Sequence, residues 1–132
     1  MDLSNYSADM AAIPFEVIIK HPISGKETDN IISVVGVDSP AAQAVLDIQQ
    51  TKRFNELAVS TEENKSVFDA VQQRHDTVEL LVACTVGWKN VMWKGELLEF
   101  TQDNVRFIYD KVPTIREQIN RAVGSRKNFF KD

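Results

Sequence analysis

Residues 84–130, CTVGWKNVMWKGELLEFTQDNVRFIYDKVPTIREQINRAVGSRKNFF, hold both tryptophans and four of the seven phenylalanines of the chain. Apolar residues recur at spacings of three and four within 101–112 and again within 113–124, which predicts two amphipathic helices. Thr101 is placed to cap the first helix, and Pro113 to end it or to open the second. This stretch therefore predicts a helical C-terminal third.

The part upstream of the first of these helices, 88–100, has no regular apolar period. Gly95 marks a turn in it, and we expect an irregular loop rich in aromatic residues. Before that loop, apolar residues repeat along a helix that we expect to end near Gly87, a candidate C-cap.

A β-rich region opens the chain. Apolar and polar residues alternate from Phe15, a turn signal follows at 21–26, and a β-branched run occupies 31–37. The pattern predicts an antiparallel hairpin. Because both faces of the second run are apolar, we expect other elements to cover both.

Helix signals begin immediately after the second run. Ser39 and Pro40 have the residue types of an N-cap and a first helical position. Apolar residues between 41 and 58 give a moderate helical stripe. Ser60 and Glu63 match a capping box, which predicts that a second helix starts there.

The expected architecture is α+β, with an N-terminal β-hairpin or small antiparallel sheet followed by a mostly helical body of about four helices. A chain of 132 residues fits a single domain. We expect it to comprise a flexible arm (1–13), the β-hairpin (14–38), helices (39–87), and an aromatic loop with C-terminal helices (88–132).

Composition narrows the classes of function. The single cysteine excludes an internal disulfide framework and a cysteine-based zinc cage. The N-terminus lacks the pattern of a secretory leader and no apolar run reaches about 20 residues, so we expect an intracellular protein without a membrane span. The net charge is −4, yet six basic and only two acidic residues follow residue 110. Such a basic tail either complements helix dipoles, which we favour, or docks an acidic partner or a phosphate backbone.

The residue pattern contains no convincing catalytic or metal-binding set. His21 and His75 lie far apart, and neither has ligand spacing to a second histidine or to Cys84. His75 lies on an apolar helical stripe, so we expect it to be half-buried and hydrogen-bonded. Cys84 is expected to be a small core residue. We expect no enzyme activity, no metal and no cofactor.

The aromatic residues of the C-terminal third allow two interpretations. They form a stacking platform for single-stranded nucleic acid, or they hold a helical subdomain together. We favour the second. Trp88 and Trp93 are the hardest to place in a core, and tryptophans flanked by lysines in a loop suit a protein partner.

Several segments together resemble one known family. They are Thr85–Lys89, Phe100–Thr101 with Asn104, Arg106 and Tyr109, then Pro113, Ile115–Ile119 and Arg126–Phe129, preceded by His21–Gly25 and Val37–Pro40. With these segments the chain resembles a tail assembly chaperone of long-tailed bacteriophages. The resemblance runs from about Phe15 to Phe129, is densest in the final third, and leaves 46–74 unmatched.

The resemblance implies a non-enzymatic protein that binds the phage tape-measure protein, keeps it soluble and helps recruit tail-tube subunits. It also implies self-association, action in the host bacterial cytoplasm and absence from the mature virion. From side-chain chemistry alone, the candidate partner contacts are Trp88, Trp93, Phe129 and Phe130, with Arg116 as a charged neighbour. The alternatives are a structural neck or tail-completion protein retained in the virion and, less favoured, a single-stranded nucleic-acid-binding protein.

Overall fold

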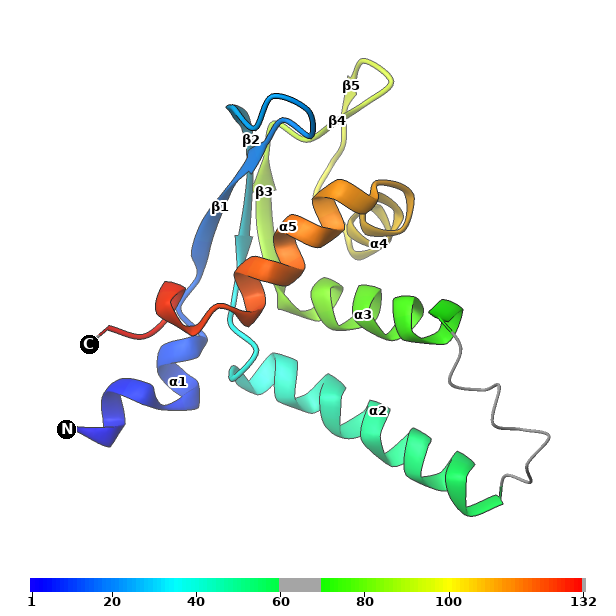
Figure 1. Cartoon of the computed structure of the whole chain (residues 1–132). Coiled ribbons are helices and arrows are strands. Elements are labelled where there is room, and N and C mark those ends of the chain that lie inside the picture. Colours follow the sequence, from blue (N-terminus) through cyan, green and yellow to red (C-terminus); the bar gives the residue numbers. More distant parts are fainter. Residues whose placement is uncertain (60–69, 132) are drawn as a thin grey trace.

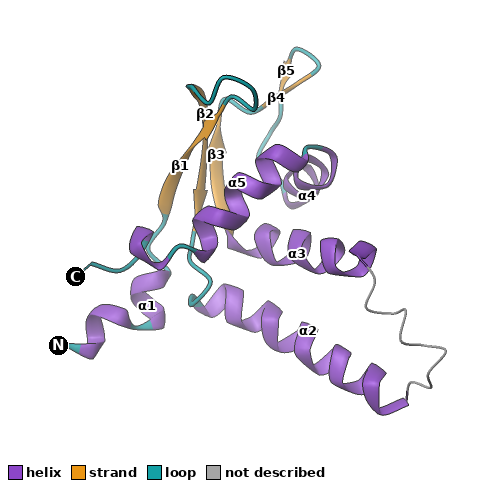
Figure 2. Cartoon of the chain, in the orientation of Figure 1, coloured by secondary structure: helices purple, strands orange, loops and turns teal. Residues whose placement is uncertain are grey.

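A computed structural model describes residues 1–59 and 70–131. It confirms the α+β class: a small antiparallel sheet stands to one side and helices pack against one of its faces (Figures 1 and 2). The N- and C-terminal segments lie near each other at one end of the sheet (Figure 1). The expected start of a helix at Ser60 and Glu63 lies outside the described residues.

The sheet has the strand order β1-β2-β3, formed by β1 (Phe15–Lys20), β2 (Glu27–Val34) and β3 (Thr85–Lys89). The expected hairpin of β1 and β2 is confirmed. Gly25 supplies the left-handed backbone of the turn, with a φ of 73°. The His21 imidazole stabilises the same turn, because its Nδ1 accepts hydrogen bonds from the backbone of Ile23 and Ser24.

The two faces of the sheet differ in cover. Ile32 and Val34 of β2 are fully buried against the helices. On the opposite face, a Cβ added at Gly87 would meet nothing within 4 Å, and Ile18 is 43% exposed. The expectation that both faces of the second strand are covered is therefore wrong. An antiparallel sheet tolerates this because one of its faces can stay in water.

The first thirteen residues are not the expected loose arm. They form a 3₁₀ turn (η1, Leu3–Tyr6) and a short helix (α1, Ala8–Ala11), capped by the side chains of Asp2 and Ser7. Ala11 is buried, and its carbonyl accepts a hydrogen bond from the backbone of Gly36. The segment is thus tied to the end of β2.

The described helices that follow are α2 (Pro40–Val59), α3 (Ala70–Cys84), α4 (Gln102–Lys111) and α5 (Pro113–Gly124), with a final 3₁₀ turn (η3, Arg126–Asn128). The capping signals at the starts of α2 and α4 are confirmed. The Ser39 hydroxyl accepts from the backbone N–H of Ala42, and the Thr101 hydroxyl from that of Asn104.

The end of α3 differs from the prediction. The helix stops at Cys84 and the chain continues as β3, so Gly87 is a strand residue and not a helix cap. The stretch expected to be irregular also contains structure. Trp88 belongs to β3, and β4 (Met92–Trp93) pairs with β5 (Glu96–Leu97) in a small hairpin.

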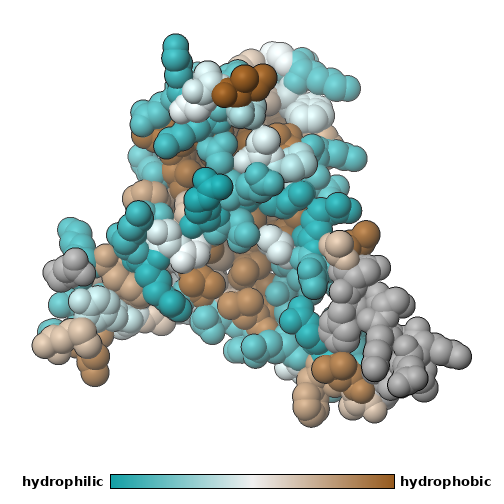
Figure 3. Space-filling model, in the orientation of Figure 1, coloured by the Kyte–Doolittle hydropathy of each residue, from teal (hydrophilic) through white to brown (hydrophobic). Residues whose placement is uncertain are grey.

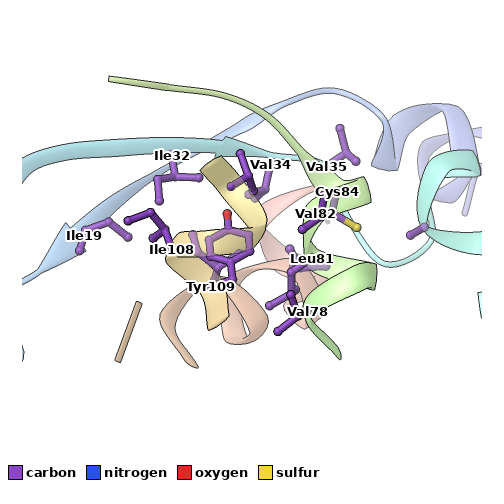
Figure 4. Packing of buried hydrophobic residues seen from close by; sticks show 14 of the residues in the cluster. Ile19, Ile32, Val34, Val35, Val78, Leu81, Val82, Cys84, Ile108 and Tyr109 are labelled. Carbon is purple, nitrogen blue, oxygen red and sulfur yellow. The ribbon is translucent and has the colours of Figure 1, made fainter. Parts of the chain in front are cut away.

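The core lies between the sheet and helices α3, α4 and α5. Figure 4 shows Ile108 and Tyr109 of α4 beneath Ile32 and Val34 of the sheet, with Leu81 of α3 beside them. All five side chains are at most 2% exposed. Helix α2 contributes little to this core: among residues 40–58 only Ala42 is buried.

A buried hydrogen-bond chain marks the point where α3 becomes β3. The Thr85 hydroxyl donates to the carbonyl of Leu81 (2.7 Å), and this uses its only hydrogen. The Tyr109 hydroxyl, 2.7 Å away, is therefore the donor to Thr85 Oγ1. Burial raises the pKa of Tyr109 above its usual value near 10, which keeps the phenol neutral and able to donate.

Removing this donor is expected to destabilise the fold. Tyr109→Phe keeps the ring but leaves Thr85 without its donor, and we expect a loss of about 1–2 kcal/mol in the free energy of unfolding. Tyr6→Phe is the matched control, because Tyr6 is exposed. Urea denaturation of both variants measures the effect. Equal stability of the two variants would contradict the role given to the Tyr109 hydroxyl.

Candidate protein-docking surface

Trp88 and Trp93, both predicted as partner contacts, are half-buried and packed within the fold. The Trp88 indole donates to the carbonyl of Leu98 (3.0 Å), and its ring meets Phe100 edge-on with 5.6 Å between centroids. The Trp93 ring meets Phe107 of α4 in the same way at 5.0 Å. Trp93 therefore fastens the β4–β5 hairpin to α4, and Trp88 fastens the segment after the hairpin to β3.

A tight turn joins Trp93, the last residue of β4, to β5. Lys94 and Gly95 both have positive φ, 50° and 84°, as the two-residue type I′ turn requires. Gly95 is thus the turn residue that the sequence predicts. Past the hairpin, the backbone of Leu98 returns to donate to the carbonyl of Val91, which closes the loop.

Arg116, the predicted charged neighbour, serves the junction of α4 and α5. One guanidinium nitrogen donates to the carbonyl of Tyr109 at 2.8 Å. That carbonyl belongs to the last turn of α4, where backbone acceptors lack intrahelical partners. Arg116 therefore caps α4 from the start of α5.

Phe129 and Phe130 lie in the C-terminal segment beside the N-terminus. Phe129 packs over Gly36 and meets Phe15 edge-on, with 5.9 Å between ring centroids. Phe130 meets Tyr6 at 5.7 Å. The five predicted contacts thus serve different parts of the fold: Trp88 packs on residues 98–100 and Trp93 on α4, Arg116 joins two helices, and the phenylalanines hold the chain ends together.

A two-pronged ion pair also fixes this C-terminal segment. Arg126 Nε and Nη2 donate to the two carboxylate oxygens of Asp38 at 2.7 and 3.0 Å. The hydrogen bonds from Arg126 lower the pKa of Asp38. At least one residue of the basic tail therefore serves the fold.

The largest exposed apolar side chains of a described helix are instead on α2. Ile48 is 69% exposed, Phe54 72% and Leu57 55%. Figure 3 shows hydrophobic side chains over the far half of this helix. A surface helix normally turns one apolar stripe toward the core and polar residues outward. Helix α2 departs from this arrangement at Ile48, Phe54 and Leu57.

Polar contacts explain why α2 keeps its position without burying these residues. Gln49 Nε2 donates to the backbone carbonyl of Asp76 on α3 at 2.8 Å. Arg53 forms an ion pair with the Asp76 carboxylate at 3.5 Å. The face of α2 toward α3 is thus partly polar, and the two helices run side by side away from the sheet (Figure 1).

A hollow lies between α3 and α4, with a volume of about 400 Å³. Val71, Val78 and Phe107 contribute its apolar lining. At its rim, Arg106 Nε donates to both carboxylate oxygens of Glu79, at 3.0 and 3.1 Å.

We use the name docking surface for α2 residues Ile48, Phe54 and Leu57 together with Val71 of α3.

His75 also borders the hollow, but not as predicted. Its side chain is 65% exposed, and Nδ1 lies 3.8 Å from Asp76, so the expected half-buried, hydrogen-bonded histidine is wrong. The apolar stripe on which that expectation rested is itself exposed at Val71.

The described residues show little reactive chemistry. Among them, no group of three or more His, Cys, Asp or Glu side chains is arranged to hold a metal ion. Cys84 is buried, and burial raises the pKa of its thiol to about 11, so it stays protonated at neutral pH. None of the helices within 1–59 and 70–131 combines the length and apolar character needed to cross a membrane.

Comparisons with protein-family models, curated proteins and solved structures found no match for this chain. The function is therefore argued from the surface itself. Ile48 and Phe54 were not among the predicted site residues. Ile48 lies on the apolar stripe of this helix, whereas Phe54, six residues on, points about 120° away from it around a helix. A large apolar residue off the stripe is the signal that the sequence offered.

The close contact of Phe129 with Gly36 permits a test of whether Phe129 is a structural residue. A Cβ at Gly36 would lie 2.9 Å from the Phe129 ring. Gly36→Ala is expected to displace the ring and cost about 1–3 kcal/mol of unfolding free energy. In a Phe129→Ala background the same change should cost much less, because the obstructing ring is gone. Thermal and urea unfolding of the four proteins measure the coupling, and equal costs in both backgrounds would contradict the contact.

Proposed function

We propose that this chain is a non-enzymatic tail assembly chaperone of a long-tailed bacteriophage, which binds the tape-measure protein and helps recruit tail-tube subunits. The observation that carries the proposal is the docking surface on α2. A 20-residue helix with one buried residue among positions 40–58 has apolar side chains available for a partner. Clustered exposed apolar residues are typical of interaction sites.

A long helical client suits the shape of this surface. Helices bind other helices through apolar residues repeated along one side, and Phe54 and Leu57 lie three positions apart on adjacent turns. Ile48, on another side of α2, remains available for a further contact. Two sides of one helix thus offer contacts to a client and to a second copy of the chain, in line with the proposed self-association.

The energetics favour repeated weak binding over one tight contact. Fully burying an Ile, Leu or Phe side chain contributes about 1.5–3 kcal/mol. Three partly exposed residues therefore supply only a few kcal/mol against an association cost of about 4–15 kcal/mol. Many copies along one long client overcome this limit because linked contacts reinforce each other. Coating a tape-measure protein is a task of this kind.

The proposal places the protein in the host bacterial cytoplasm and outside the finished particle. Mass spectrometry of purified virions separates it from its main alternative, a neck or tail-completion protein, which would remain in the virion. The nucleic-acid alternative needs free aromatic faces. Trp88 and Trp93 are each engaged by another ring, so the fold offers that alternative less support.

The docking surface is tested by one pair of matched substitutions. Phe54→Asp should reduce co-purification of the co-expressed tape-measure protein from the same genome by about tenfold or more, because a charge replaces apolar area buried against the client. Ile48→Asp should reduce it as well, because the contact between copies that reinforces binding along the client is lost. Ile23→Asp is the control, since Ile23 is 91% exposed on the hairpin turn, away from α2. Circular dichroism confirms that all three variants are folded.

Undiminished co-purification with both α2 variants would contradict the assigned surface. Detection of the chain in purified virions at the abundance of structural proteins would contradict the chaperone role itself. The two outcomes are independent of each other.

A further inference from the structure

Strand β1 is at an edge of the sheet. It ends the strand order, with β2 on one side and no strand of the described chain on the other. Alternate residues of a strand direct their backbone N–H and C=O groups to the same side. The Ile19 carbonyl points to β2, where it accepts from the Thr28 hydroxyl. The backbone groups of Glu16, Ile18 and Lys20 therefore point to the open side.

Gln118 of α5 occupies one position along this edge. Its side-chain oxygen accepts from the Lys20 N–H at 2.8 Å, and its Nε2 donates to the Lys20 carbonyl at 3.0 Å. This primary amide bonds Lys20 as a peptide group of a neighbouring strand would. The edge is thus able to accept strand-like partners, and Glu16 and Ile18 remain open beside the amide.

A groove of about 500 Å³ runs along the same edge. One wall is β1 with the following turn, and the other is one side of α5, from Thr114 to Ala122, with the residues after that helix. Arg121 and Lys127 on the far wall and Lys20 on the near wall are basic, whereas Glu117 is the one carboxylate among the described lining residues. The net charge of the chain is −4, so this groove opposes the overall charge.

We propose that the groove binds an extended, acidic segment of a partner protein as an additional strand on β1. The segment would pair its backbone with the open groups of Glu16 and Ile18, in the manner of β-strand addition. Alternate side chains of an added strand point to opposite faces. Acidic side chains would face Arg121 and Lys127, and apolar ones would lie beside Ile18.

The chemistry of the edge favours this occupant over others. A helix has no free backbone groups in its middle with which to pair. A second copy pairing through its own β1 would bring one acidic and one basic residue of the open edge, Glu16 and Lys20, and so no net negative charge for the basic wall. The site is also separate from the docking surface on α2, so the inference does not depend on the proposed function.

Fluorescence anisotropy with the full chain tests the proposal. The probe is a fluorescein-labelled octapeptide in which glutamate and valine alternate. Arg121→Glu should weaken its binding by about tenfold or more, because it reverses a charge on the groove wall. Lys94→Glu is the matched control: it changes the net charge equally, in the turn between β4 and β5, and should leave binding unchanged.

A second arm tests the backbone pairing. Ile18→Pro removes the outward N–H of β1, and proline is tolerated on the open side of an edge strand. Binding should be lost in Ile18→Pro and kept in Ile18→Val. An octapeptide with an N-methyl group on every residue, which has no backbone N–H to donate along either edge, should not bind either, and this result holds even if Ile18→Pro fails to fold.

Three results would overturn the proposal. The first is no binding of the alternating peptide at low salt. The second is binding of the N-methylated peptide, or of an eight-nucleotide thymidine strand, as strong as that of the unmethylated peptide. The groove would then bind anions in general, without backbone pairing. The third is a dimer seen by sedimentation in the wild type and lost in Ile18→Pro, which would make a second copy the occupant.

Discussion

The structure depends on the point at which α3 stops and the chain enters the sheet. Thr85 sits there with its hydroxyl bonded to the last turn of α3 and to the buried Tyr109 of α4. One residue earlier, the Cys84 carbonyl accepts from the backbone of Val35 at 2.8 Å, just beyond β2. A helix end, a sheet end and a second helix thus meet in one buried place. Unpaired polar groups are costly in such a place, so the contacts specify the junction strongly.

The remaining C-terminal elements are fastened to this junction in turn. Arg116 bonds the Tyr109 carbonyl and so places α5 relative to α4. Further on, Phe129 packs on Gly36 at the end of β2. The aromatic and basic residues that attract attention in the sequence are thus largely used in closing a small fold. Within the described residues, the core formed in this way does not extend to the far half of α2, where Ile48 and Phe54 are exposed.

The sequence predicted the elements whose signals are local. The caps at Ser39 and Thr101 and the turn at Gly25 follow from residues a few positions apart. It did not predict β3, because Thr85 continues the helical spacing of the residues before it. Only pairing with a distant partner, Ile32 opposite Trp88, makes this segment a strand. Of the candidate site, the tryptophans were singled out because they were hard to place in a core and lie near lysines. Their packing against Phe100 and Phe107 depends on the whole fold, which local sequence signals do not specify.

Exposed apolar residues on α2 raise the question of how the free chain avoids aggregation. Charged residues are interspersed among them: Asp47 and Lys52 flank Ile48, and Glu56 precedes Leu57. Interspersed charges of both signs limit the size of each apolar patch and oppose non-specific association. They also oppose tight specific binding, since a partner must leave those charges in solvent. The same arrangement suits the weak and reversible binding that the proposed chaperone role requires.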